Sequence, residues 1–179
     1  IIGFLKGYEI GFLLIPVKVI IKQDLPPIAI GSVNLPETHE GDVIEVPRWV
    51  AEIMVQMDFV EIQEEGFDLE LFKALSRERM QDPSQISTLK ADFYVKMKRQ
   101  MNLMRAMIKR DESLKEAYEK LSSSAYDLIT LRTSKLLYLT GSSVLSPDLE
   151  RKITPEEKNL FELIRSIIEG WKKAILEVD

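Results

Sequence analysis

The chain has 179 residues, a formal net charge of −5, 45% hydrophobic and 30% charged residues, and no cysteine. This length suits one or two domains, and the missing cysteine excludes a disulfide framework, a thiol nucleophile and a thiolate metal site. No apolar run approaches the roughly 18 residues of a membrane span, and we expect no signal peptide but a cytoplasmic protein, with a composition typical of thermophiles.

Charge is divided unevenly along the chain. Residues 1–66 contain 4 Lys/Arg and 11 Asp/Glu, whereas residues 67–179 contain 20 and 18. The first part is therefore strongly acidic and the second nearly neutral, which favours two domains, 1–65 and 66–179. The alternative is chance variation in composition between a small domain and a larger one, because charge patterns report on partners and not on fold.

The first segment predicts a small β-rich domain. We expect strands at 8–14, 17–22, 28–30, 43–46 and 59–62, with a polar loop at 32–42. Pro47 suits the first position of a short helix, because its missing N–H costs nothing there. Trp49 follows, and we expect its indole to fill the centre of this domain. A module this small has a marginal core, so we expect it to lean on a partner or on the second domain.

The second segment predicts four amphipathic helices. We expect one from a cap at Asp68 to Met80, one over 89–109, one over 112–139 with Gly141 as its stop, and a fourth after a linker at 142–153. Thr154 and Glu157 form a capping box around Pro155 at the start of the fourth helix. Four such helices can form one bundle. The predicted fold class is α+β, with a small β-rich domain followed by a larger all-α helical-bundle domain.

Signatures of catalysis are missing from the sequence. The one histidine, His39, lies in a polar loop, where solvation is the usual role of a lone histidine. No phosphate-binding glycine motif and no nucleophile elbow are present. We therefore expect no enzyme, no metal and no cofactor.

A basic stretch raises the possibility of nucleic-acid binding. It comprises Lys96, Lys98, Arg99, Arg105 and Lys109. Such residues can neutralise phosphates, although a solvated helix face opposite the methionine-rich side is the favoured interpretation. Neither interleaved aromatic residues nor a helix-turn-helix spacing accompany them.

The third predicted helix is apolar around most of its circumference, which indicates contacts on two sides. Arg132 and Lys135 lie within this apolar surface and require a carboxylate partner. We expect a subunit interface here, made by Tyr118, Leu121, Leu128, Leu131, Arg132, Lys135, Leu136 and Leu139. The methionines of residues 97–107 are expected to pack in the core or against the same partner.

Three segments carry a resemblance to a known family. Val46, Pro47 and Trp49 belong to a strand, Pro-x-Trp helix, strand unit that resembles the small domain of GINS subunits, the scaffold proteins of the replicative helicase. Residues 89–94 and 127–136 are similar to helix segments of the GINS helical domain. The chain order, with the β-rich domain first, resembles the branch that contains the eukaryotic subunits Psf-two and Psf-three and their archaeal counterpart.

This resemblance implies a role in DNA replication without a chemical step. The implied partners are a helix-first GINS subunit, in a heterotetramer with two copies of each, the MCM helicase and a Cdc45/RecJ-like protein. By this resemblance the chain is a replisome scaffold and helicase accessory factor at an archaeal replication fork, and contact with DNA would be indirect or weak. The alternative is a nucleic-acid-binding helical protein that uses residues 90–110.

Overall fold

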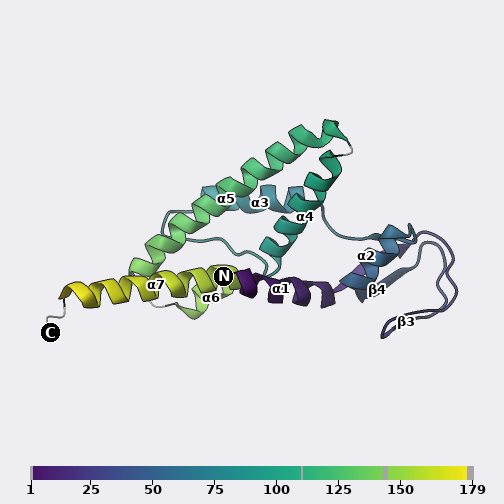
Figure 1. Cartoon of the computed structure of the whole chain (residues 1–179), viewed down its shortest axis with the longest axis horizontal. Coiled ribbons are helices and arrows are strands. Elements are labelled where there is room, and N and C mark those ends of the chain that lie inside the picture. Colours follow the sequence, from purple (N-terminus) through teal and green to yellow (C-terminus); the bar gives the residue numbers. More distant parts are fainter. Residues whose placement is uncertain (1, 110, 143–144, 177–179) are drawn as a thin grey trace. The chain divides into compact units, whose positions relative to one another are not determined.

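The computed structural model describes every residue except 1, 110, 143–144 and 177–179. The chain forms two compact units, Ile1–Glu65 and Gly66–Asp179. Strands occur only in the first unit among the described residues, and the second unit is helical (Figure 1). The fold class is α+β, as the sequence predicts.

A three-stranded antiparallel sheet organises the first unit. Strand β1 (Pro16–Ile21) lies between β4 (Val43–Pro47) and β5 (Val60–Ile62), with Val19 paired to Ile44 on one side and to Ile62 on the other. Alternate residues of β1 point into the core, as expected for a strand with one covered face. The fully buried members are Val17, Val19 and Ile21.

The segment expected to form the first strand is instead a helix, α1 (Ile2–Leu14). The prediction of a strand over 8–14 is therefore wrong. Ile10 is the only β-branched residue in this segment, and Leu, Tyr and Phe supply the remaining large apolar side chains. Tyr8, Ile10 and Phe12 alternate with Glu9 and Gly11, but so short an apolar run does not distinguish a strand from a helix.

Two further elements complete this unit. Strand β2 (Ile28–Ile30) lies where a strand is expected, and it forms a hairpin with β3 (Val33–Leu35), which occupies part of the expected polar loop. Helix α2 (Arg48–Gln56) starts one residue later than expected, with Pro47 as the residue before its first turn. Its buried face contributes Val50, Ala51 and Met54 to the core.

Three long helices begin the second unit. They are α3 (Phe67–Met80), α4 (Phe93–Ile108) and α5 (Lys115–Ser142), the last preceded by a short 3₁₀ turn, η1 (Glu112–Leu114). Gly66, not Asp68, precedes the first turn of α3. Gly141 does not stop α5, because it lacks the positive φ that a glycine terminator adopts.

The predicted linker at 142–153 contains a short helix, α6 (Pro147–Lys152), and its residues 143–144 lie outside the described part. Helix α7 (Pro155–Leu176) follows. The predicted capping box is confirmed: the backbone N–H of Glu157 donates to Thr154 Oγ1 at 3.3 Å, and the N–H of Thr154 donates to Glu157 Oε2 at 3.0 Å.

The long helices do not share one core. Helices α3, α4 and α5 enclose a cluster around Leu71, Phe93 and Leu128. A second cluster joins the later part of α5 to α6 and α7 around Leu136 and Phe161. Figure 1 shows that α7 meets α5 near the C-terminal end of α5, which is opposite the end that turns into α4. Helix α5 therefore carries one core on each half of its length.

Candidate functional site

Arg132 lies on α5 between the two helical cores and is 1% exposed. Its guanidinium makes two parallel contacts to Glu157 of α7, Nε to Oε1 at 2.5 Å and Nη2 to Oε2 at 2.7 Å. Its Nη1 donates to Oε2 of Glu78 on α3 at 2.8 Å. The fork of an arginine suits such paired recognition of carboxylates, so one side chain fastens three helices.

The two carboxylates have further partners, which together form the buried ionic cluster of Glu78, Ser87, Tyr94, Arg132, Lys135 and Glu157. Tyr94 donates its hydroxyl to Glu157 at 2.7 Å. Lys135 Nζ lies 2.8 Å from Glu78 Oε1. Ser87 donates both its backbone N–H and its hydroxyl to Glu78. Two buried cations thus face two buried anions, which is the condition for keeping charges out of water.

The surroundings shift the pKa of three of these groups. Burial alone would raise the pKa of Glu78, but the contacts with Lys135 and Ser87 and the charge of Arg132 outweigh it and hold this pKa below its usual value. Burial and the neighbouring Glu157 raise the pKa of Tyr94. Burial would lower the pKa of Arg132, yet Glu157 raises it. At neutral pH Glu78 and Arg132 are therefore charged and the Tyr94 hydroxyl is neutral.

This geometry corrects the interface expected on α5. Five of the eight residues are already covered by the chain itself: Leu121, Leu128, Arg132, Lys135 and Leu136. The carboxylates required by Arg132 and Lys135 come from α3 and α7 and not from a partner. Tyr118, Leu131 and Leu139 are partly exposed. The sequence analysis did not identify Glu78 and Glu157 as the partners of Arg132, because each lies more than twenty residues away along the chain.

A different surface of α5 remains uncovered. Tyr126 is 72% exposed, Ile129 42% and Leu137 50%. Between residues 128 and 141 the helix contains two charged residues, Arg132 and Lys135, and both are buried. We call this surface the uncharged face of α5. Depletion of charge with retained apolar and aromatic groups is typical of the centre of a protein–protein interface.

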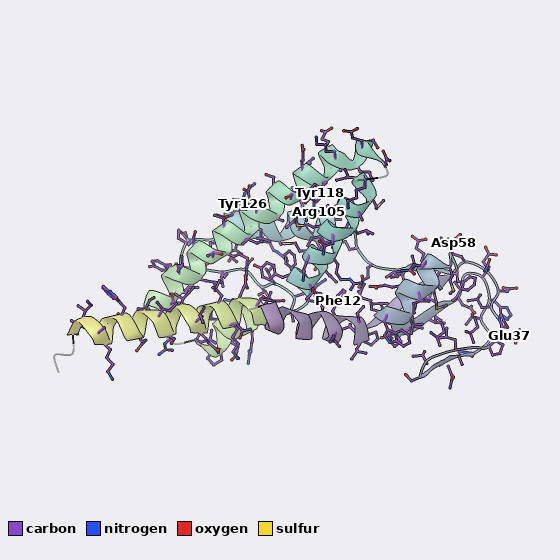
Figure 2. All side chains as sticks on the ribbon, in the orientation of Figure 1. Phe12, Glu37, Asp58, Arg105, Tyr118 and Tyr126 are labelled. Atoms are coloured by element: carbon purple, nitrogen blue, oxygen red, sulfur yellow. The ribbon has the colours of Figure 1, made fainter. Side chains whose placement is uncertain are left out.

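The basic stretch is partly engaged within the chain. Lys96 lies 3.1 Å from Asp92 and 3.8 Å from Glu70. Arg105 donates to the Tyr118 hydroxyl from Nη2 at 2.8 Å, and the two side chains meet between α4 and α5 (Figure 2). Lys98 and Arg99 also have interactions within the chain, while Lys109 is exposed. Most of these basic side chains therefore already interact with other residues of the chain and are less available to DNA phosphates.

The first unit retains the residues of the resemblance but arranges them differently from expectation. Val46 is buried, whereas Trp49 packs at the edge of the core and not at its centre. Trp49 covers the turn of the β2–β3 hairpin, where a Cβ added to Gly31 would lie 3.2 Å from the indole. Pro47 is partly buried.

Arg48, between Pro47 and Trp49, was not singled out from the sequence. It is buried, stacks over the Phe12 ring of α1 with its Cζ 4.2 Å from the ring centroid, and forms an ion pair with Glu64. Its backbone N–H donates to Ile15 at 2.9 Å. Arg48 therefore fastens α1 to the sheet, and only the proximity of Pro47 and Trp49 marks it in the sequence.

The described residues show neither a metal site nor a membrane-spanning helix. No group of three or more His, Asp or Glu residues is placed there to hold a metal ion. His39 is exposed in its loop, 3.6 Å from Asp24. Within the same part of the chain, every helix is too short or too polar to cross a membrane.

Comparisons with known proteins do not identify the chain. No model of a known protein family matches it, and no curated protein matches it significantly.

Proposed function

We propose that this protein is a non-enzymatic scaffold subunit of the GINS type, with the β-rich unit first. In this role it joins a helix-first GINS subunit, two copies of each, and the assembly links the MCM helicase to a Cdc45/RecJ-like protein at the replication fork. The proposal starts from the resemblance of residues 46–49, 89–94 and 127–136 to that family.

The uncharged face of α5 is the structural observation that carries the proposal. A solvated helix of this length would normally expose charged side chains on its outer surface. Here the outer surface presents Tyr126, Ile129 and Leu137, with threonine and serine between them. Because the chain's own cores cover another side of the helix, this face supports a second helical protein as the partner.

Direct DNA binding is the competing function. Several of the basic residues that suggested it have partners within the chain. Lys96 and Arg105 are held by Asp92 and Tyr118. A protein that uses few free cations releases few counterions and binds DNA weakly at physiological salt. The scaffold function is therefore the better supported of the two.

Stimulation of the helicase tests the proposal. The chain would be co-expressed with a helix-first subunit and added to MCM with a Cdc45/RecJ-like protein. We expect the wild type to increase unwinding and Ile129→Glu/Leu137→Glu to remove the increase, because an unpaired charge buried in an interface is costly.

The control variant is Lys115→Glu, which changes an exposed charge at the first turn of the same helix. It should retain full stimulation. If wild-type protein neither binds the helix-first subunit nor alters unwinding, the scaffold proposal is wrong.

A further inference from the structure

A second apolar surface of the helical unit is concave. It is a groove of about 670 Å³ where the first turn of α3 meets α4 and the early part of α5. Leu69, Phe72, Met104 and Leu121 line its apolar floor and walls. Phe72 is 65% exposed, although it is one of the largest apolar side chains of the unit. An exposed phenylalanine beside an apolar groove is a feature of docking sites.

The groove also carries two charges with no ion-pair partner among the described residues. They are Asp68, on α3, and Lys120, on α5. Since they come from different walls, a complementary ligand is apolar along its centre, cationic on one flank and anionic on the other. Amphipathic helices recognise grooves in this manner, with large side chains at intervals of three and four residues.

Helix α7 of the same chain has that pattern. Its first turns are covered through Glu157 and Phe161, but a row at intervals of four residues remains exposed beyond them: Leu163, Ile167, Trp171 and Ile175. Rows of this spacing form the ridges that pack into grooves between helices. Lys172 lies beside one flank of the row and Glu162 beside the other, and both are exposed. We call this the exposed row of α7.

We propose that the exposed row of α7 docks in the α3–α4–α5 groove of a second copy of this chain. In this contact Glu162 lies on the side of Lys120, and Lys172 lies on the side of Asp68. Because each copy offers both a row and a groove, two copies can exchange α7 reciprocally around a two-fold axis, which closes the assembly as a dimer.

The donor of the helix is a second copy because α7 is fixed elsewhere in its own molecule. The Arg132–Glu157 pair holds the start of α7 beside the later part of α5, whereas the groove adjoins residues 117–124 at the earlier part. The row is exposed in this arrangement. This inference goes beyond the proposed function and does not rest on it, since the groove and the uncharged face of α5 are different surfaces.

Cross-linking between two single-cysteine proteins tests the contact. The chain has no cysteine of its own, so the assay has no background thiol. Ala174, on the apolar side of α7, and Ala117, in the groove, are changed separately to cysteine in full-length protein. The two proteins are then mixed and treated with a short bis-maleimide. We expect a covalent heterodimer, with the cross-link between positions 117 and 174 identified by mass spectrometry.

Matched variants make the result specific. Ala106→Cys places the thiol on an exposed position of α4 outside the groove, and paired with Ala174→Cys it should give at least tenfold less product. Phe72→Glu should abolish the 117–174 product, while Arg77→Glu, an exposed change elsewhere on α3, should not. Phe72 and Arg77 are both exposed, so both variants should keep wild-type circular dichroism.

The outcomes separate this contact from the proposed function. Equal cross-linking of positions 106 and 117, or none at 117, overturns the inference even if the helix-first subunit still co-purifies. Selective cross-linking at 117 that is lost with Phe72→Glu supports it, even if no helix-first subunit binds.

Discussion

Arg132 of α5 and Glu157 of α7 form a two-point ion pair, with contacts of 2.5 and 2.7 Å, inside the helical unit. Glu157 is held in turn by the capping box at the start of α7 and by Tyr94 of α4. The pair thus connects the beginning of one helix to the middle of another at the junction of the two helical cores. Together with the apolar cluster around Leu136 and Phe161, this ion pair holds the start of α7 beside α5.

The first prediction concerns removal of this arginine. Arg132→Met should lower the free energy of unfolding by about 3–5 kcal/mol, because it leaves Glu157 buried without a cation and leaves Glu78 with Lys135 alone. Arg132→Lys should lose less, since it keeps the charge but not the two-point geometry. Urea denaturation followed by circular dichroism measures both. Arg79→Met is the control: Arg79 forms an exposed ion pair with Asp127 and should contribute at most about 1 kcal/mol.

The second prediction concerns acid. The pKa of Glu78 is lowered in the folded protein from a usual value of 4.5. Its ionised form therefore contributes stability that is complete above pH 4.5 and is lost as the pH falls through the lower, folded-state pKa. We therefore expect the free energy of unfolding of the wild type, measured with urea, to fall more steeply as the pH drops below 5 than that of Glu78→Gln.

Glu37→Gln provides the control for this pH dependence, because Glu37 is exposed in a loop of the other unit (Figure 2). It should retain the steepness of the wild type. If Glu78→Gln loses stability with acid as steeply as the wild type, Glu78 is not the group responsible.

Predictability from sequence differed between the two halves of the chain. The helices of the second half were foreseen because their apolar residues recur every three or four positions, and the Thr154–Glu157 capping box marked the start of α7 accurately. The strand expected at 8–14 is a helix in the structure, because the pattern of so short an apolar segment does not distinguish the two. The prediction of a single bundle was wrong. Ile86 and Leu89, in the segment between α3 and α4, belong to two different cores, and the sequence does not show this.

The candidate site was foreseen only in part. The need of Arg132 and Lys135 for carboxylates was evident, but local sequence cannot show that Glu78 and Glu157 supply them. The interface was therefore assigned to the buried side of α5. The apolar residues of α5 extend beyond its buried side, and the exposed ones are Tyr126, Ile129 and Leu137. The proposed interface therefore lies on these exposed residues.

The third prediction compares two glycines of the first unit. Gly31 and Gly41 both have positive φ, of 61° and 89°, so alanine at either should cost about 1–2 kcal/mol. Gly31→Ala should cost more, because its Cβ would lie 3.2 Å from Trp49, whereas the space at Gly41 is open. Measured in a Trp171→Phe background, Gly31→Ala alone should also shift the fluorescence of Trp49. Equal losses and unchanged fluorescence would contradict the packing of Trp49 on this turn.

The fourth prediction separates the scaffold from a DNA-binding protein. Binding of the assembled complex to duplex or single-stranded DNA should fade by physiological salt, because few free cations release few counterions. Charge reversal at Lys98 and Lys109 should leave helicase stimulation intact. Sub-micromolar DNA affinity at physiological salt that is lost on this reversal would favour the nucleic-acid function instead.

The most direct test of the scaffold account is the native mass of the complex formed on co-expression with a helix-first GINS subunit. We predict a species with two copies of each chain, and we predict that Ile129→Glu/Leu137→Glu removes the partner while Lys115→Glu does not. The recovery of this chain free of the helix-first subunit in the wild type, or a complex of unchanged mass after both substitutions on the uncharged face of α5, would contradict the account.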